Sequence, residues 1–326
     1  MLRVTGAFAP DMSTRIVATA FGGPEVLQTV EYEMPTPGPG EVALKVRAAG
    51  VNPIDHKLYS GQFGTDSDDL PMPLGFEVAG VVTAVGDGAS GPRGPVSVGD
   101  EVIAYGVNGG YADELVVSAN AVVPKPTALD WAPAAGLMLA GVTAFHAVAV
   151  VAPEDGDTVL IHSGAGGVGI VAVQLAVARG ARVIATASPR NHDFLRDLGA
   201  EPVAYGDGLV ERVRELAPNG VDAAIDLYGD DSAVDTSLAL VSDRTRIVTV
   251  AGFERAQADG FTAIGSGPGA DPGTELRAAA RLELTDLVDR GDLEVVVDST
   301  YPLREVAAAH TRSIDGHVRG KIVLVP

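Results

Sequence analysis

The first part of the chain consists of short apolar runs that are separated by clusters of proline and glycine. The turn residues gather most densely over residues 34–40, which read MPTPGPG. Short apolar runs between such clusters are typical of β-strands joined by tight turns. The pattern therefore predicts a mostly β domain over residues 1–135. Its expected strands include residues 15–18, 42–46, 77–82, 100–104 and 114–117.

From about residue 136, strand-length apolar runs alternate with longer helical segments. This alternation predicts a parallel sheet with helices on both faces, and we expect such a doubly wound domain over residues 136–265. The expected strands are 158–162, 182–186, 202–205, 223–227 and 246–250, and the expected helices are 168–179, 191–198 and 209–216. Further on, the pattern predicts a glycine-rich loop over 265–273, a helix over 275–289 and a final strand over 320–325. The fold class is therefore α/β.

A glycine-rich turn joins the first strand of this second domain to its helix. Gly164, Gly166 and Gly169 satisfy the pattern G-x-G-x-x-G, and Gly167 and Val168 complete the turn. The pattern is informative here because an apolar strand ends just before it and an apolar helix opens directly after it. Gly164 allows the tight turn, Gly166 lets the backbone approach a pyrophosphate, and Gly169 lets helix pack on strand. We therefore predict that these five residues bind a dinucleotide at the helix N-terminus.

The end of the second strand of this domain indicates which dinucleotide is bound. A site for NAD would place a carboxylate there to bind the ribose 2′-hydroxyl, but residues 185–190 read ATASPR and contain none. Ser188 and Arg190 can instead bind a 2′-phosphate, and the guanidinium does so with a bidentate fork. The sequence therefore favours NADPH, although Arg190 is also compatible with an ordinary surface position.

The composition limits the partners and the chemistry. The formal net charge is −20, from 43 acidic and 23 basic residues, and a field of that sign repels nucleic acid and anionic membranes. No apolar stretch reaches the roughly 18 residues that span a bilayer, and residues 1–11 do not resemble a secretory signal. We expect disorder over 1–11, with Met12 a possible native start, and a cytoplasmic protein. Cysteine is absent, which excludes disulfides, thiolate nucleophiles and cysteine-ligated zinc.

Seven short motifs, in order along the chain, identify a family. Together they resemble the quinone oxidoreductase branch of the medium-chain dehydrogenase/reductase superfamily. The resemblance implies a GroES-like catalytic domain, formed by the N-terminal part and by a return of the chain over 266–326, with a Rossmann domain between them. It also implies a homodimer joined through the Rossmann sheets. The motifs occupy residues 21–27, 50–55, 75–80, 98–102, 109–112, 140–144 and 319–323.

The resemblance also assigns residues to the cofactor site. It implies that Asn52 lies near the nicotinamide ribose, Thr143 on the nicotinamide side of the cleft, Tyr205 near the adenosine phosphate and Gly252 beneath the nicotinamide ring. Lys321, in the last motif, is assigned to the same site. Local alternatives remain open for three of them, since Asn52 could make an Asx turn, Thr143 could cap a helix and Tyr205 could be an edge aromatic.

Two departures from the superfamily pattern bear on catalysis. Phe76 stands where zinc-dependent relatives have the histidine of Gly-His-Glu and cannot bind a metal, and the six histidines show no paired metal spacing. We therefore expect no metal site. Tyr59 stands where many members have arginine, and its phenol could donate a proton to the reduced substrate or simply line the pocket. Asn52 and Tyr59 are the candidate catalytic residues.

These observations predict an NADPH-dependent enzyme that reduces quinones or α,β-unsaturated carbonyl compounds without a metal. Two alternatives stay open. The chain could be an enoyl or ketone reductase of a biosynthetic pathway, or a protein that binds NADPH without turnover. The expected partner is a small-molecule quinone or enone, and the physiological substrate is not identified by the sequence.

Overall fold

Antiparallel strands form most of the N-terminal part of the computed structural model, which describes residues 12–326. Residues 1–11, for which disorder was expected, lie outside the described residues. The main sheet has the order β10-β8-β5-β3-β18-β17, and β9 also pairs with β3. Its strands are β3 (Glu41–Val51), β5 (Glu77–Val85), β8 (Glu101–Tyr105), β9 (Glu114–Ser118), β10 (Val122–Pro124), β17 (Val297–Pro302) and β18 (Lys321–Val325).

Two smaller sheets complete this part of the molecule. The strands β1 (Met12–Ala18), β2 (Leu27–Glu33) and β4 (Met72–Pro73) form one, and the hairpin of β6 (Ser90–Gly91) and β7 (Gly94–Pro95) forms the other. Each of the five apolar runs that predicted strands coincides with part of β1, β3, β5, β8 or β9 to within one residue. Their inward side chains form one buried cluster, which explains why short runs of Val, Ile, Leu and Ala suffice for these strands.

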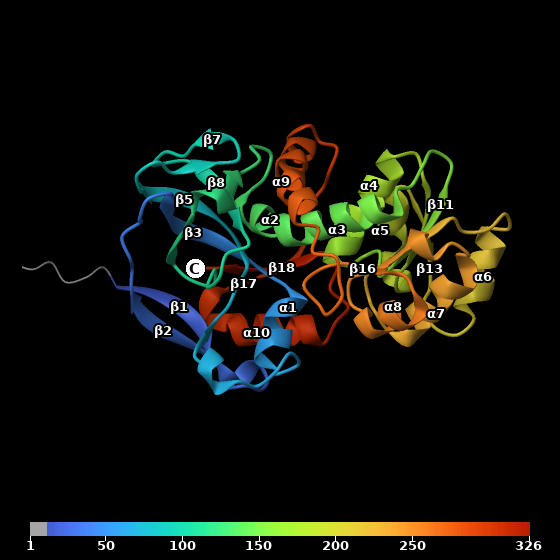
Figure 1. Ribbon diagram of the computed structural model, residues 1–326, viewed down its shortest axis with the longest axis horizontal. Helices are drawn as coiled ribbons and strands as arrows, with labels where there is room; N and C mark the ends of the chain where they lie inside the picture. The colour runs from blue at the N-terminus through green and yellow to red at the C-terminus, as the bar shows by residue number, and fades with distance from the viewer. Residues whose placement is uncertain (1–11) are drawn as a thin grey trace, which may run out of the picture.

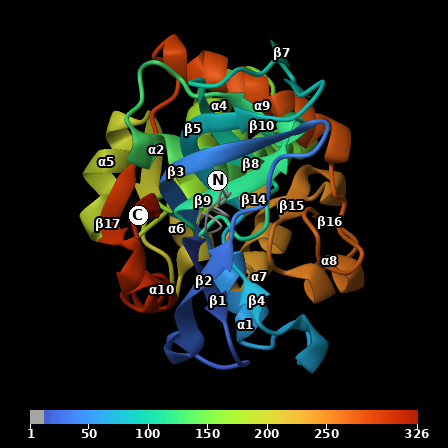
Figure 2. The same cartoon turned by 90° about the vertical axis from the view of Figure 1, so that its left-hand side faces the viewer.

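The last strands of the chain belong to the N-terminal sheet. β18 pairs antiparallel with β3, so that Val323 lies opposite Gly50, and parallel with β17. Figure 2, which views this end of the molecule, shows β17 and the helix α10 (Val306–Ile314) beside the N-terminal strands. The chain thus closes its first domain with its C-terminal segment, which brings Lys321 into the centre of that sheet.

A six-stranded parallel sheet forms the other half of the molecule, at the right of Figure 1. Its order is β13-β12-β11-β14-β15-β16, so that the first strand, β11, lies beside the fourth, β14. In open sheets of this kind, ligands bind at the carboxyl ends of the strands, where the strand order reverses. The strands are β11 (Thr158–His162), β12 (Arg182–Thr186), β13 (Ala200–Val203), β14 (Ala223–Asp226), β15 (Ile247–Thr249) and β16 (Thr262–Ala263). This half is Rossmann-like.

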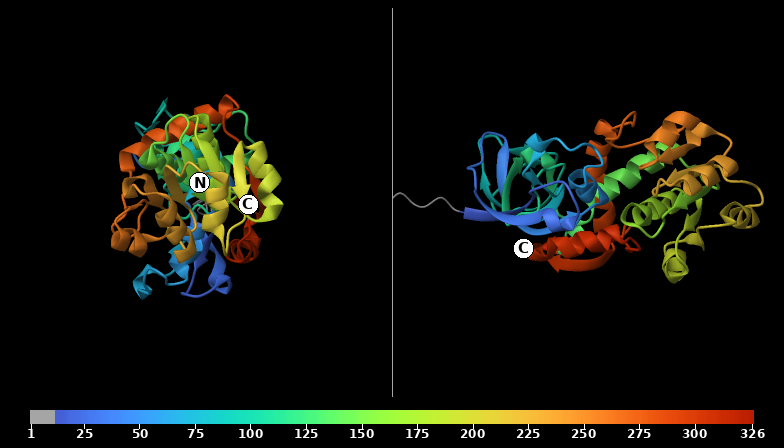
Figure 3. Two further views of the ribbon diagram at one scale, coloured as in Figure 1. Left: turned by 90° about the vertical axis from the view of Figure 1, so that its right-hand side faces the viewer. Right: turned by 90° about the horizontal axis from the view of Figure 1, so that it is seen from below.

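The remaining helices lie within the N-terminal part, connect it to this sheet or flank the sheet (Figures 1 and 3). They are α1 (Pro53–Tyr59), α2 (Trp131–Ala135), α3 (Met138–Val151), α4 (Gly167–Ala178), α5 (His192–Asp197), α6 (Leu209–Leu216), α7 (Asp231–Leu240), α8 (Phe253–Asp259) and α9 (Thr274–Asp289). None of the helices within residues 12–326 combines the length and the apolar content that crossing a bilayer requires.

Several elements were not predicted from the sequence, including α7, α8, α10, β16 and β17, and two further differences have a clear physical reason. The helix α3 has no counterpart in the predicted pattern, because nearly all its residues are apolar and most are buried, so that no polar face marks a helical period. The strand β13 covers 200–203 rather than 202–205, because the buried side chains of Ala200 and Val203 pair with β12. Tyr205 consequently lies beyond the strand and is 54% exposed.

The glycine-rich turn is packed too tightly for side chains at two of its positions. A Cβ atom on Gly164 would lie 2.7 Å from the Cβ of Ala185 in β12, and one on Gly169 would lie 2.2 Å from the carbonyl oxygen of Ser163. A Cβ on Gly166 would have no heavy atom nearer than 3.3 Å. Two of the glycines therefore serve the contact between helix and sheet, whereas Gly166 leaves room at the surface of the turn.

This difference leads to a prediction about stability. Gly169→Ala should lower the free energy of unfolding by about 1–3 kcal/mol, because the new methyl group forces α4 away from the backbone of the turn. Gly166→Ala is the matched control and should change it by less than about 1 kcal/mol, since its backbone (φ −76°) suits alanine. Urea denaturation of both variants measures the two values. Equal losses would contradict this account of the turn.

Candidate functional site

Most residues predicted to bind the cofactor lie at one edge of the parallel sheet. The glycine-rich turn follows β11, Ser188 and Arg190 follow β12, Tyr205 follows β13, and Gly252 follows β15. Since all six strands are parallel, these positions share the carboxyl edge of the sheet. Asn52, Thr143 and Lys321 come from other elements and require separate description.

The N-terminus of α4 has the features of a phosphate site. The backbone N–H groups of Gly167, Val168 and Gly169 make no hydrogen bond to another residue of the described chain, whereas Ile170 donates the first helical bond, to Gly166. Such free N–H groups, together with the helix dipole, favour an anion. With these N–H groups and no side chain on Gly166, this turn fits the pyrophosphate of a dinucleotide.

The end of β12 presents cationic rather than anionic groups. Thr186, at the end of the strand, accepts a hydrogen bond from the N–H of Ser163, and no carboxylate follows it. Ser188 is half-buried, and its hydroxyl accepts a hydrogen bond from the Asn191 amide at 3.4 Å. Arg190 is exposed and donates a hydrogen bond to the carbonyl of His317. A guanidinium is therefore present beside the turn.

Lys321 is buried and makes an ion pair inside the molecule. Its side chain is 5% exposed, and its Nζ donates to Glu77 Oε1 at 3.0 Å, to the carbonyl of Val51 at 3.1 Å and to Asn52 Oδ1. Its methylene groups pass close to the glycine-rich turn, since a Cβ on Gly167 would lie 2.9 Å from Lys321 Cδ. The lysine therefore touches the turn through its apolar stem, while its charge is directed toward Glu77.

Asn52 is also committed to contacts within the protein. It is 2% exposed, and its amide Nδ2 donates to Glu77 Oε1 at 3.0 Å and to the carbonyl of Gly50 at 3.4 Å. Its backbone N–H donates to Asp55 Oδ2 at 2.7 Å, which closes the first turn of α1. The structure thus brings Asn52 and Lys321 together around Glu77, with the polar atoms of the Asn52 side chain already bonded.

Thr143 lies in the middle of α3 and connects this group to the rest of the site. Its hydroxyl donates to the carbonyl of Leu139 at 2.8 Å, and the N–H of Leu139 donates to Glu77 Oε2 at 2.8 Å. Thr143 does not cap the helix, which was one of its open alternatives, because α3 begins at Met138. A continuous hydrogen-bonded path therefore leads from Asn52 through Glu77 and Leu139 to Thr143.

Tyr59 lies away from the glycine-rich turn, inside the N-terminal part. It is 1% exposed and packs in the buried apolar cluster of that part, and its hydroxyl bonds to His310 Nδ1 at 2.8 Å. Burial raises the pKa of the Tyr59 phenol. A proton donor must reach the substrate, so this placement argues against that interpretation of Tyr59.

The hydroxyl of Tyr59 begins a buried chain of polar groups that the sequence analysis missed. His310 Nε2 lies 3.3 Å from the Tyr111 hydroxyl, and Tyr111 donates to Asp55 Oδ2 at 2.6 Å. Burial raises the pKa of Asp55 to about 7 and lowers the pKa of His310 to about 3. The spacing of Asn52 and Asp55, which suits a capping box, was the one sequence signal for this buried chain of polar groups.

A second group of polar residues, also missed, lies next to Thr143. Arg277 of α9 donates from Nη1 to the Thr143 hydroxyl at 3.5 Å and from Nε to His146 Nδ1 at 3.2 Å. His146 Nε2 lies 3.2 Å from Asp271 Oδ2. Since arginine can only donate, His146 Nδ1 accepts, and its Nε2–H donates to Asp271. Burial, followed by the nearby Arg277 charge, lowers the pKa of His146, in agreement with a neutral ring.

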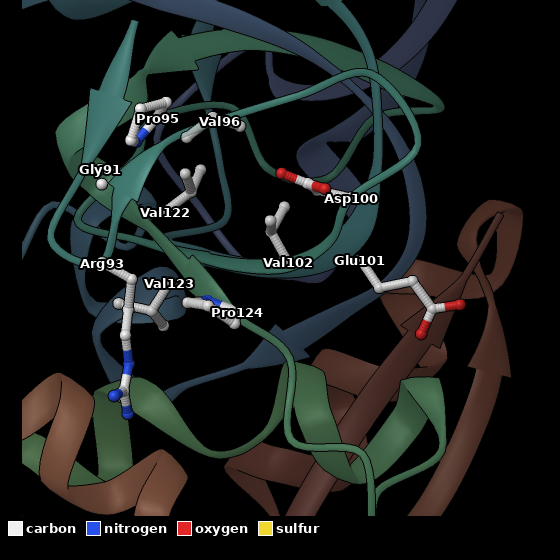
Figure 4. Close-up of a pocket in the computed structure, with 11 residues that line it drawn as sticks. Gly91, Arg93, Pro95, Val96, Asp100, Glu101, Val102, Val122, Val123 and Pro124 are labelled. Atoms are coloured by element: carbon white, nitrogen blue, oxygen red, sulfur yellow. The ribbon is translucent and has the colours of Figure 1, made fainter.

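A separate cavity of about 210 Å³ lies in the N-terminal part and contains none of the predicted residues (Figure 4). It is bordered by the hairpin β6–β7 and by β8 and β10. Its lining residues are Gly91, Arg93, Gly94, Pro95, Val96, Asp100, Glu101, Val102, Val122, Val123 and Pro124. Within residues 12–326 no three His, Asp or Glu side chains gather as a metal site would require.

Comparison with known families matches both parts of the chain. Residues 38–127 match the alcohol dehydrogenase GroES-like domain, and residues 198–324 match a family described as zinc-binding dehydrogenase. Among curated proteins, a quinone oxidoreductase of Pseudomonas aeruginosa is 34% identical over 97% of this chain and 100% of its own length.

Solved structures resemble the whole chain as well. The quinone oxidoreductase of Escherichia coli, solved in complex with NADPH, is similar with a TM-score of 0.84 and 29% identity, over 96% of this chain and 100% of that one. The enoyl reductase CurK is similar with a TM-score of 0.83 and 27% identity, over 96% and 99% of the two chains.

The buried pair of Glu77 and Lys321 generates a testable prediction. Lys321→Met should lower the free energy of unfolding by about 3–5 kcal/mol, because it leaves a buried carboxylate without its cation. Adding Glu77→Gln should recover part of this loss, with a coupling energy of about 1–3 kcal/mol in a double-mutant cycle. The exposed pair of Lys45 and Glu114 is the control, and Lys45→Met should cost less than about 1 kcal/mol. Urea denaturation measures the free energy of unfolding of all the variants. Similar losses for Lys321→Met and Lys45→Met would refute the special contribution of the buried pair to stability.

Proposed function

The chain belongs to the quinone oxidoreductase-like proteins of the medium-chain dehydrogenase/reductase superfamily, and we propose that it catalyses the NADPH-dependent reduction of quinones or α,β-unsaturated carbonyl compounds. The observation that carries this proposal is the carboxyl edge of the parallel sheet. There, a helix N-terminus with free N–H groups lies beside a strand end that bears Arg190 and no carboxylate. The NADPH complex of the similar Escherichia coli enzyme supports the same cofactor.

Particular residues of this chain would hold NADPH. The N–H groups of the turn would bind the pyrophosphate, Ser188 and Arg190 the 2′-phosphate, and Tyr205 the adenosine end. Thr143, Gly252, Asn52 and Lys321 would border the nicotinamide half, where Asn52 and Lys321 also hold each other and Glu77 in place. When bound, NADPH supplies a hydride. The residues proposed for the turn are Gly164, Gly166, Gly167, Val168 and Gly169.

We propose that the reaction requires no metal. Phe76 and the absence of cysteine remove the usual ligands of zinc, and a metal would be needed most for a saturated carbonyl, where the charge collects on one alkoxide oxygen. A quinone or enone that accepts hydride spreads its charge over a ring or an enolate, which hydrogen bonds can stabilise. A proton from solvent then completes the reduction of a carbon–carbon double bond or a quinone oxygen.

We also propose a cytoplasmic homodimer joined through the Rossmann sheets, in which β16 is an edge strand. The net charge of −20 supports a small-molecule substrate over nucleic acid.

The likeness to CurK keeps an enoyl reductase of a biosynthetic pathway as the second candidate. A protein that binds NADPH without turnover remains as an outcome of the tests below.

Selectivity for the cofactor tests the role of Arg190. Arg190→Ala should weaken NADPH binding about tenfold to a hundredfold, because a charged hydrogen-bond partner of the 2′-phosphate contributes roughly 1.5–3 kcal/mol. The affinity for NADH should hardly change. Fluorescence titration of both cofactors provides the two dissociation constants, and an equal loss for both would refute the assignment.

A matched panel of substrates tests the reaction. The value of kcat/KM with NADPH should be at least about a hundredfold higher for a quinone and an enone than for the corresponding saturated ketone, a difference of roughly 2.7 kcal/mol in barrier. Dialysis against a strong chelator should leave these values unchanged. Preference for an enoyl thioester would favour the second candidate. A higher rate with the saturated ketone, or loss of activity on dialysis, would contradict the proposal that charge delocalised in the substrate replaces a metal. NADPH binding without reduction of any compound would indicate a protein without turnover.

A further inference from the structure

The groups first considered as partners for the substrate oxygen are used elsewhere in the structure. The amide of Asn52 donates to Glu77 and to the carbonyl of Gly50, and the hydroxyl of Tyr59 bonds to the buried His310. Thr143 donates its hydroxyl proton to the carbonyl of Leu139. These three groups therefore leave no free side-chain donor for the oxygen of the reduced substrate.

Arg277 is a cation whose charge is not paired with a carboxylate. Its side chain is half-buried, and among residues 12–326 it makes no ion pair with Asp or Glu. Its two side-chain contacts are with neutral acceptors, the ring of His146 at Nε and the hydroxyl of Thr143 at Nη1. The guanidinium has five N–H groups, so three remain without a partner among residues 12–326. Two hydrogen bonds thus orient the guanidinium, and its other N–H groups can bind a ligand.

The position of Arg277 is set from two sides. On one side α9 packs against α3, where Gly141 lies so close to Leu284 that a Cβ would come within 2.9 Å of it. On the other side, the loop that follows β16 is held to α3 by the bond between Asp271 and His146. A Cβ on Gly273 would lie 2.3 Å from the His146 ring, so this loop and the ring are in close contact.

This loop lies at the carboxyl edge of the parallel sheet. Asp271 donates its backbone N–H to the carbonyl of Ala263, the last residue of β16, and accepts from the N–H of Gly265. Arg277 therefore lies beside Thr143, the residue proposed to face the nicotinamide, and is linked through His146 to the loop at the carboxyl edge of the sheet. That is the region where a substrate must lie to accept a hydride.

We propose that Arg277 is a further substrate-binding residue of this site, whose guanidinium binds the oxygen atom on which negative charge develops when a quinone or enone is reduced. The proposal rests on the proposed function. Thr143 and His146 act as positioning residues, because each accepts one N–H of Arg277 without adding a negative charge, and the Asp271 carboxylate acts on Arg277 only from beyond His146. In a partly buried site, such a charge stabilises an enolate or hydroquinone anion far more than water does.

The test uses 4-nitrophenol, whose ionisation is visible by its absorbance and whose anion resembles a hydroquinone anion. Titrated with full-length protein saturated with NADP⁺, the phenolate should bind at least about tenfold more tightly than the neutral phenol, because an opposite charge within about 4–6 Å lowers a pKa by roughly 1–3 units. In R277Q this preference should fall below about threefold. The value of kcat/KM for quinones should fall by about 10²–10³.

Three controls separate this role from a structural one. R290Q removes an exposed arginine from the end of the same helix and should leave both measurements unchanged. R277K keeps a cation and should retain a preference for phenolate, which covers the case in which R277Q does not fold. The dissociation constant of NADPH should be the same in R277Q as in the original protein.

Two results would overturn the proposal, namely a phenolate preference that persists in R277Q and an original protein that shows no such preference. Failure of the proposed function would look different. In that case the original protein would prefer phenolate but reduce neither quinones nor enones.

Discussion

The rest of the structure depends on one buried ion pair, that of Glu77 and Lys321. Removing two charges from water is costly, and a buried pair is tolerated only where further hydrogen bonds satisfy both groups. Here Asn52 and the N–H of Leu139 bond to the carboxylate, and the carbonyl of Val51 and Asn52 accept from the ammonium. The pair and its partners come from β3, β5, β18, the start of α1 and the first turn of α3. The requirement to satisfy two charges therefore joins the C-terminal strand, the N-terminal sheet and the helix that connects them.

The same pair sets the geometry next to the cofactor turn. The methylene groups of Lys321 pack beside Gly136 and Gly167. A Cβ atom on either glycine would lie closer to the lysine side chain than ordinary van der Waals contact allows. Gly167, expected to serve a phosphate, thus also admits a lysine side chain from a distant part of the sequence. The bridge between Gly166 and Gly320 ties the turn to the residue before Lys321. Folding of the first domain and positioning of the turn are therefore coupled.

Local patterns and long-range contacts differ in how far they can be predicted from sequence. The strands β11 and β12 were predicted with their observed bounds, because buried parallel strands form continuous apolar runs that end at turn residues. The helix α3 was missed because it is apolar on all sides, so its sequence lacks the alternation of apolar and polar positions that reveals a helix. The partner of Lys321 could not be predicted, since Glu77 is 244 positions away and no local rule connects them. The buried placement of Tyr59 could not be predicted for the same reason, because its hydroxyl bonds to His310, 251 positions away.

The buried Lys321 and the half-buried Arg277 differ in what their charge can do. Lys321 bonds directly to a carboxylate, so its charge is largely neutralised within the pair. Arg277 instead bonds to a hydroxyl and a neutral imidazole, so its charge can still act on a ligand. The overall charge of −20 opposes the approach of anions from solution, which disfavours substrates that are already negative. A quinone or an enone avoids this cost because it enters neutral. Its negative charge arises only after hydride has been accepted, beside Arg277, so the acidic surface and this arginine favour the same class of substrate.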